Sequence, residues 1–403
     1  MLLYRLIVPI FATLVLARLA LRRNWPALRQ RLARSPARPG PHLWLHAASN
    51  GELASAKPLI VALEAARPDL PLQVTCNSEG GVALAESWGL TARLAPLDLA
   101  PVARRMHRDW DVRAHVTLES ELWPNRVRTC PGPVFVIGGR LSEGTAKGWR
   151  LFGGLLPDVL GRLSYVSAQD AGSLERYLAA GLPRAAAGPV LNLKEFYAPD
   201  PRRDATLSAG FDRAHTWLAA STHEGEEEIV LAAHGLAREH EPALRLILAP
   251  RHPRRGDAVE GLIREAGLSC ARRSRGEAPE EAEVYLADTL GEMGLLYPLA
   301  GRLFIGGTLT DRGGHTPFEP AAYAAALLHG PDVANHAAPF ARLEAAGAAV
   351  EVRDAATLAD ALTRLAAPEQ QEALGRAAQE TLRPDTDMDQ LVAAITQRLD
   401  PPE

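Results

Sequence analysis

The stretch 302–320 constrains the fold more than any other part of the chain. It begins with a short apolar run typical of a buried parallel strand, passes through Gly306-Gly307 and Gly313-Gly314, and reaches Pro317, which suits the first turn of a helix. A helix that starts after a glycine turn presents free N–H groups and the positive end of its dipole to an anion. We therefore expect a phosphate site here, with Glu319 binding sugar hydroxyls. The alternative is that the glycines only form a tight turn.

Short apolar runs recur along the chain, and helical segments separate them. Strands that alternate with helices in this way form a parallel sheet covered by helices on both faces, so we predict an α/β fold. The predicted strands are His42–Ala47, Leu72–Cys76, Val112–Leu118, Pro133–Ile137 and Leu163–Ser167 in the first half, and Thr216–Thr222, Leu244–Ala249, Val284–Asp288 and Arg302–Ile305 in the second.

The N-terminus is basic and apolar at once. Residues 1–40 contain eight arginines and no acid, and the apolar run Leu6–Ala17 lies between Arg5 and Arg18. The run is shorter than the roughly 20 residues that a membrane span needs. The arginines that follow favour anionic lipid on the cytoplasmic side. We expect an anchor in the inner leaflet of the inner membrane, with a spanning helix or a packed soluble helix as alternatives.

The length of the chain, 403 residues, is enough for two domains. A polar segment with repeated prolines, Pro199–Asp204, marks their connection. We predict a membrane anchor at 1–40, a first domain at 41–190, a linker at 191–212 and a second domain at 213–403.

The composition argues against two kinds of site. The 44 basic and 48 acidic residues leave a net charge of −4, so no overall basic field favours nucleic acid. Cys76, Cys130 and Cys270 are far apart and form no Cys-x-x-Cys pair. They indicate buried thiols in a reducing compartment rather than disulfides or zinc ligands.

Charged residues at the ends of predicted strands are the candidates for chemistry, because open α/β sheets bind ligands there. Glu52 follows the first strand, although a carboxylate at a helix start also stabilises the dipole. For Glu119 and Glu121 we expect one acid to face a crevice and the other to cap or pair. Arg251 suits a phosphate, or is a surface arginine. We expect Glu226–Glu228 to be a solvated helix start.

Seven segments in chain order resemble the 3-deoxy-D-manno-octulosonic acid (Kdo) transferases, and the likeness covers nearly the whole chain, including the anchor. Any one segment alone is a weak signal, whereas seven in order are specific. The segments are Ser49-Asn-Gly-Glu52, Glu119-Ser-Glu-Leu-Trp-Pro-Asn125, Arg140-Leu-Ser-Glu143, Ser221-Thr-His-Glu-Gly-Glu-Glu227, Pro250-Arg-His-Pro253, Asp288-Thr-Leu-Gly-Glu292 and Gly313-Gly-His-Thr-Pro-Phe-Glu319.

The resemblance implies two Rossmann-like domains that face each other across a cleft, the GT-B glycosyltransferase fold. It implies an inverting transfer of Kdo from CMP-Kdo to a lipid A precursor, lipid IVA, at the cytoplasmic face of the inner membrane during lipopolysaccharide synthesis. It implies no cofactor and no metal, because no Asp-x-Asp motif at the predicted site supplies a cation site. The expected partners are thus the donor, the acceptor and anionic lipid, without nucleic acid.

The same resemblance assigns the site residues. Glu52 matches the general base, and Glu119 and Lys194 match the residues that stabilise the transition state. The positions that match the CMP-sugar site are Pro250, Arg251, Leu290, Gly291, Glu292, Thr316, Pro317, Phe318 and Glu319.

Four departures from the family pattern lie near these positions: Asn50, Gly139, Thr316 and the turn Cys76-Asn-Ser-Glu-Gly80. They bear on donor affinity, acceptor choice and sugar identity. Two other functions are therefore kept: a different nucleotide-sugar transferase or epimerase on the same fold, and a catalytically silent lipid-binding relative. A comparison of CMP binding with UDP binding tests the alternative nucleotide-sugar enzyme. Turnover with any donor excludes the catalytically silent relative.

Overall fold

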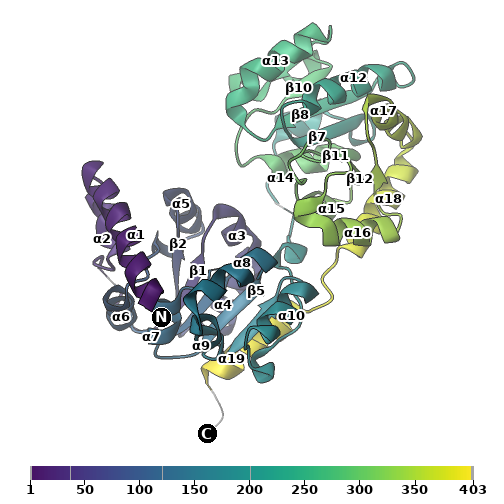
Figure 1. Ribbon diagram of the computed structural model, residues 1–403. Coiled ribbons are helices and arrows are strands. Elements are labelled where there is room, and N and C mark those ends of the chain that lie inside the picture. The colour runs from purple at the N-terminus through teal and green to yellow at the C-terminus, as the bar shows by residue number, and fades with distance from the viewer. Residues whose placement is uncertain (1, 37, 120, 200, 401–403) are drawn as a thin grey trace. The chain divides into compact units, whose positions relative to one another are not determined.

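The chain forms two compact α/β units in a computed structural model, which describes residues 2–36, 38–119, 121–199 and 201–400 (Figure 1). Met1 of the predicted anchor, Ser120 of the second motif and Asp200 of the linker lie outside these ranges, as do the last three residues. Unit 1 comprises residues 1–196 and 384–403, and unit 2 comprises residues 197–383.

Unit 1 is built on a six-stranded sheet in the order β3-β2-β1-β4-β5-β6, and every pairing is parallel. The direction of winding reverses between β1 and β4, and such a switch point is where open sheets leave a crevice for ligands. The strands are β1 (His42–Ala47), β2 (Leu72–Cys76), β3 (Thr91–Leu94), β4 (Val112–Leu118), β5 (Val134–Gly139) and β6 (Tyr165–Ala168).

The strands β1, β2 and β5 are buried along their whole length. This burial shows that apolar helix faces cover both sides of the sheet. The helices of unit 1 are α1 (Leu2–Leu21), α2 (Trp25–Arg31), α3 (Asn50–Ser55), α4 (Lys57–Ala66), α5 (Glu79–Ser87), α6 (Ala100–Asp109), α7 (Pro124–Thr129), α8 (Glu143–Trp149), η1 (Arg150–Phe152), α9 (Leu155–Leu160), α10 (Ala171–Ala179), η2 (Arg184–Ala186), η3 (Leu193–Phe196) and α19 (Met388–Leu399).

Unit 2 contains a second, seven-stranded parallel sheet in the order β13-β12-β11-β7-β8-β10-β9. The predicted α/β class, two Rossmann-like domains, is therefore confirmed. The strands are β7 (Thr216–Thr222), β8 (Arg245–Pro250), β9 (Cys270–Arg272), β10 (Val284–Leu286), β11 (Arg302–Ile305), β12 (Ala326–His329) and β13 (Val350–Glu351).

The helices of unit 2 pack on both faces of that sheet through two apolar clusters. They are α11 (Ala205–Gly210), η4 (Arg213–His215), α12 (Glu226–Arg238), η5 (Pro253–Arg255), α13 (Gly256–Glu265), η6 (Arg273–Arg275), η7 (Pro279–Glu281), α14 (Met293–Leu296), η8 (Tyr297–Leu299), α15 (Phe318–Ala322), η9 (Ala334–His336), α16 (Ala337–Ala345), α17 (Ala355–Arg364) and α18 (Pro368–Thr381).

The C-terminal helix α19 belongs to unit 1, whereas the sequence analysis placed it in the second domain (Figure 1). Its buried residues Leu391, Val392 and Ile395 join the core that α4 and β1 share. The apolar face of α19 has the same 3.6-residue period wherever the helix docks, so the sequence pattern does not identify the sheet that it covers.

The N-terminal helix α1 is longer than its apolar run. It includes Arg5 and Arg18, and the segment Leu3–Leu21 has a mean hydropathy of 1.8, which makes it long and apolar enough to cross a membrane by length and composition. The sequence analysis judged the apolar run Leu6–Ala17 too short for a membrane span, and that judgement is wrong for the whole helix, which extends beyond the run at both ends.

Candidate functional site

Glu52 lies where β1 ends and α3 begins. Ser49 caps α3 by accepting the N–H of Glu52, and the Glu52 carboxylate accepts the N–H of Ala48 at 2.8 Å. Burial raises the pKa of Glu52 to about 7, and the charges of Glu119 and Glu121 act in the same direction, against the hydrogen bond from Ala48. A carboxylate that titrates near neutrality is suited to accept a proton from a substrate hydroxyl.

Glu119 and Glu121 follow the end of β4 and differ in their surroundings. Glu121 accepts hydrogen bonds from His46 Nε2 at 3.2 Å and from the Trp123 indole. Burial alone would raise the pKa of Glu121, but these hydrogen bonds outweigh it and lower the pKa to about 2. Of the two acids, Glu121 is therefore the paired one.

Glu119 has an unusual backbone conformation. Its φ of +50° lies in the left-handed region, which non-glycine residues seldom adopt outside turns and functional sites. Its N–H donates to Ile137 O at 3.1 Å, and its own carbonyl accepts the N–H of Arg140 at 3.3 Å. These two bonds hold the turn at the carboxyl end of the sheet, close enough to Glu52 for its charge to raise that pKa.

Lys194 lies on η3, which packs beside α3. Leu193 and Leu53, from these two elements, belong to one apolar cluster, and Asn192 Oδ1 accepts the N–H of Lys194 at 3.1 Å. The three residues predicted to be catalytic thus come from two strand ends and η3 of unit 1.

A cavity of about 310 Å³ in unit 2 gathers part of the predicted CMP-sugar set. The buried hydroxyl of Thr316 has no hydrogen-bond partner in the described part of the chain. The Arg251 guanidinium is exposed and likewise lacks a partner among the described residues. An orphan hydroxyl and an available arginine are groups that a bound phosphate or sugar would satisfy. The cavity is lined by Ala220, Ser221, Arg251, Met293, Tyr297, Leu303, Ile305, His315, Thr316, Glu319 and Pro320.

Several other predicted residues do not line this cavity. Leu290 is 75% exposed on the loop before α14, and Phe318 is buried in the core of unit 2. The Glu292 carboxylate accepts two bonds from Arg273, at 2.9 and 3.1 Å, which are the main reason that its pKa lies below its ordinary value. Pro250 ends β8, Gly291 follows Leu290 and Pro317 precedes α15.

The N–H groups of the glycine pairs are all bonded within unit 2, so they are not free to bind an anion, and a phosphate site at the helix start that follows them stays a prediction. Gly306 donates to Ala220 O, Gly307 to Glu226, Gly313 to Asp332 and Gly314 to Gly307 O. Instead, the positive φ values at the second, third and fourth of these glycines, between +71° and +76°, allow the tight turn.

Glu226 and Glu227 are fully buried, so the expected solvated helix start is wrong for both. Glu226 accepts the N–H groups of Gly307, Thr308 and Leu309 at 2.7 to 3.0 Å. Glu227 pairs with Arg255 at 2.6 Å. These acids hold the loop after β11 and the loop after β8 to the start of α12, whereas Glu228 remains exposed.

Sequence reasoning missed the role of two histidines beside the cavity. His223 and His315 stack, and their Nε2 atoms lie 2.9 Å apart, so one ring donates and the other accepts. Burial lowers the pKa of His315 to about 4, with further contributions from the charges of His223 and Arg251. Both histidines and the cavity residue Ser221 lie within motifs of the resemblance, which was the available signal; Met293 and Tyr297 had none.

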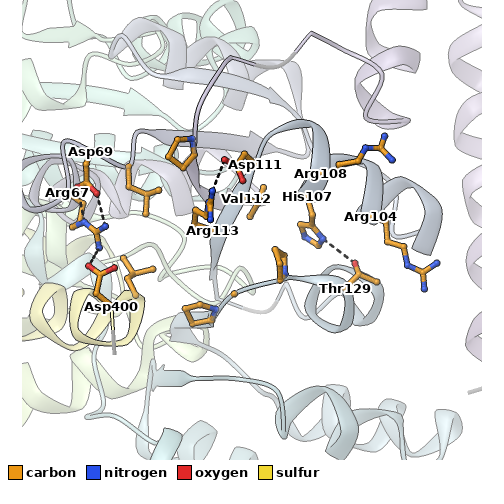
Figure 2. A pocket seen from close by; sticks show the side chains of 16 residues that line it. Arg67, Asp69, Arg104, His107, Arg108, Asp111, Val112, Arg113, Thr129 and Asp400 are labelled. Atoms are coloured by element: carbon orange, nitrogen blue, oxygen red, sulfur yellow. Dashed lines mark hydrogen bonds and ion pairs between the residues drawn. The ribbon is translucent and has the colours of Figure 1, made fainter. Parts of the chain in front are cut away.

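A larger cavity of about 810 Å³ lies at the amino ends of β1 and β4, the opposite edge of the sheet from Glu52 (Figure 2). Figure 2 shows Arg67 between Asp69 and Asp400, with both oxygen contacts at 2.8 Å. Arg113 pairs with Asp111 in the same way. Arg67 and Arg113 are neutralised by neighbouring acids, and none of the predicted site residues lines this cavity, so we place the chemistry elsewhere.

Comparison with known proteins by family and by sequence identity indicates one and the same family. Residues 26–196 match the family described as 3-deoxy-D-manno-octulosonic-acid transferase (kdotransferase). The chain is 31% identical to 3-deoxy-D-manno-octulosonic acid transferase of Haemophilus influenzae, over 89% of this chain and 88% of the relative. It is 33% identical to the enzyme of the same name from Bordetella pertussis, over 86% and 84%.

Among solved structures, UDP-GlcNAc 2-epimerase from Neisseria meningitidis bound to UDP-GlcNAc is similar, with a TM-score of 0.61. The alignment covers 89% of this chain and 100% of the epimerase at 12% identity. A likeness at that identity shows a shared fold of two parallel-sheet domains and nothing about the reaction.

Proposed function

Because the chain belongs to the family of Kdo transferases, glycosyltransferases of lipopolysaccharide biosynthesis, we propose that it transfers Kdo from CMP-Kdo to the lipid A precursor lipid IVA with inversion at the anomeric carbon. The observation that carries the proposed mechanism is the environment of Glu52, a half-buried carboxylate at the carboxyl end of β1 whose pKa is about 7.

Glu52 is the proposed general base. The acceptor hydroxyl attacks the anomeric carbon of Kdo while its proton passes to the Glu52 carboxylate, and CMP leaves as an anion. The transition state has oxocarbenium character, so the Glu119 carboxylate stabilises its positive charge. The ammonium group of Lys194 neutralises the negative charge of the donor's carboxylate or phosphate.

The cavity of unit 2 is the proposed CMP site. Arg251 at the end of β8 binds the phosphate, and the Thr316 hydroxyl and the Glu319 carboxylate bind polar groups of the nucleotide or sugar. Glu292, whose carboxylate is oriented by Arg273, is the proposed acceptor of hydrogen bonds from the ribose hydroxyls, although it lies outside the cavity lining. The remaining predicted positions are proposed to shape the site through their backbone. Arginine is sufficient to neutralise the leaving phosphate, and no metal is invoked.

The proposed location is the cytoplasmic face of the inner membrane. The apolar helix α1 and the arginines of the first 40 residues support association with anionic lipid. The acceptor is itself a membrane lipid, so an anchored enzyme encounters it by diffusion within the plane of the membrane.

A transfer assay tests the proposal. Purified protein is incubated with freshly generated CMP-Kdo and tetraacylated lipid A precursor, and products are read by mass spectrometry. We expect a gain of one or more Kdo units, which also counts the sugars added. Glu52→Gln should retain CMP binding and lose transfer by at least about 100-fold, the usual scale for a positioned base.

Glu64→Gln is the matched control, because Glu64 is exposed on α4 and should leave the rate unchanged. Transfer by Glu52→Gln within a few-fold of the unmodified protein would remove Glu52 from this role. No Kdo gain while CMP still binds would indicate another CMP-activated sugar acid, and binding of UDP in preference to CMP would favour the alternative nucleotide-sugar reaction.

A further inference from the structure

The N-terminal end of α1 is attached to the body of unit 1. The Tyr4 hydroxyl donates to Asp98 Oδ2 at 2.6 Å, and the Tyr4 ring meets the edge of Phe152 with centroids 5.8 Å apart. Asp98 also accepts the N–H groups of Asn125 and Arg126, which ties it to the start of α7. The beginning of the helix is therefore held by buried polar and aromatic contacts.

The other end of α1 returns to the same unit. Asn24, the N-cap of α2, donates to Glu79 Oε1 at 2.9 Å. Arg31 at the end of α2 donates to the carbonyls of Asn77 and Ala95 at 2.6 and 2.9 Å. Figure 1 shows α1 along one side of unit 1, with α2 beside it and α7 near its N-terminal end.

The two faces of α1 differ in burial although both are apolar. One face is half-buried against the protein and the opposite face is exposed. The exposed face is an apolar stripe that Arg18 interrupts near the end of the helix. The half-buried face consists of Tyr4, Val8, Ala12, Val15, Leu16, Leu19 and Ala20, of which Ala12 is fully buried. The exposed face consists of Leu3, Leu6, Ile7, Ile10, Phe11, Leu14 and Leu21, each between 42% and 86% exposed.

Arginines surround a cavity of about 490 Å³ beside the N-terminal end of this helix. Arg5 of α1, Arg104 of α6 and Arg162 have no acidic partner within the described ranges, and Arg128 pairs with Asp158 at 3.0 Å. Val8 and other apolar residues complete the lining, together with the polar Asn125 and Thr129. Tyr4 and Val8 of the half-buried face line this cavity, so it lies on the side of α1 away from the exposed stripe. A lipid whose acyl chains contact the exposed stripe has its phosphate on that other side.

We propose that α1 does not cross the bilayer but lies along one monolayer of anionic phospholipid, with its exposed face among the acyl chains and a lipid phosphate in the arginine cavity. This inference rests on the proposed membrane association and specifies its geometry. A helix of 20 residues is about 30 Å long, the thickness of the hydrocarbon core, so a crossing helix would place its two ends on opposite sides. Both ends of α1 are bound to unit 1, so they stay on one side.

Thiol labelling tests the orientation. Arg5→Cys and Arg22→Cys are made separately after Cys130→Ser and Cys270→Ser, which removes the two cysteines that are not fully buried. Inverted inner-membrane vesicles, with the cytoplasmic face outward, are treated with a membrane-impermeant maleimide. We expect both thiols to react without detergent. Reaction of the Arg5→Cys thiol only after detergent, with Arg22→Cys open throughout, would show a spanning helix and overturn the proposal.

Charge reversal tests the cavity. Arg104→Glu should reduce binding to vesicles that contain phosphatidylglycerol by at least about fivefold, the factor that one basic residue near an anionic surface supplies. Binding to phosphatidylcholine vesicles should hardly change. Arg108→Glu is the matched control, since Arg108 is exposed on the same helix but, unlike Arg104, does not line the arginine cavity. Equal losses in both variants would show a general surface charge and overturn the lipid site.

The outcomes separate this inference from the function on which it rests. Kdo transfer to detergent-solubilised acceptor is measured in every variant, and its absence in the unmodified protein would contradict the proposed function alone. Transfer without vesicle binding, together with self-association in ultracentrifugation, would show that a second copy covers the apolar stripe and would overturn the lipid assignment.

Discussion

At the scale of single residues, the surroundings of Glu52 separate it from the other acids at the same edge of the sheet. Glu121 receives hydrogen bonds from His46 and Trp123 and has a pKa of about 2, so it stays charged and structural. Glu52 is half buried beside two other carboxylates, which raises its pKa to about 7. Neighbouring carboxylates with separated pKa values are typical of acid–base sites.

The raised pKa of Glu52 predicts the pH dependence of transfer. A base must be deprotonated to act, so kcat/KM should rise about tenfold per pH unit below about pH 7 and level off above it. The profile is measured with CMP-Kdo from about pH 5.5 to about pH 8.5. Glu52→Gln should lose this rise, whereas Glu64→Gln should retain it. A profile that is flat through pH 7 would contradict the assignment.

Arg251 should contribute to the affinity for CMP but not to the affinity for cytidine. Its guanidinium is the charged group of the unit 2 cavity that we assign to phosphate, so Arg251→Ala should weaken CMP binding by about tenfold or more, within the range for charge-assisted hydrogen bonds. Calorimetric titration with CMP and with cytidine measures the difference, since cytidine lacks the phosphate and should bind both proteins alike. Unchanged CMP affinity would count against this role.

At the scale of elements, a buried acid organises the loop that follows β11. Glu226, the first residue of α12, binds three consecutive N–H groups of that loop and also accepts the N–H of His223. Local sequence predicts an ordinary helix start, because three acids in a first turn are common dipole partners. The burial of Glu226 depends on the loop after β11, far away along the chain, so the local pattern carries no sign of it.

Glu226→Gln should destabilise unit 2. An amide replaces one carboxylate oxygen with an N–H donor group that faces other donors, so the free energy of unfolding should fall by about 1.5 to 3 kcal/mol. Denaturant titration followed by tryptophan fluorescence measures the change. Glu228→Gln, at an exposed position two residues along, should stay within about 0.5 kcal/mol. Similar effects of both substitutions would refute the role of Glu226 as a buried loop clamp.

At the scale of the whole molecule, the chain ends in the unit where it began. Residues 384–403 leave unit 2, and α19 packs against α4 in the core of unit 1. The integrity of the proposed catalytic unit therefore depends on the last helix of the chain.

Ile395→Ala should loosen unit 1 and spare unit 2. Ile395 is fully buried, and removal of a buried branched side chain typically costs about 2 to 5 kcal/mol. Hydrogen exchange resolves the two units, and protection should fall in α4 and β1 while α17 is unchanged. Leu362→Ala, at an equally buried position in unit 2, should give the opposite distribution. Loss of protection in unit 2 alone after Ile395→Ala would contradict the packing of α19.

The sequence by itself determined the alternation of strands and helices, the two parallel-sheet domains and the acids at the strand ends, whereas the short strands β3 and β9 were not predicted. The features that it determined follow from local periodicity, and from the rule that the carboxyl ends of parallel strands meet at one edge. Only the tertiary structure decided that Glu226 occupies the glycine-loop N–H groups, that α19 covers unit 1, and that both ends of α1 return to one unit. Each of these depends on contacts between residues far apart in the chain, and an apolar face or a carboxylate does not specify its distant partner.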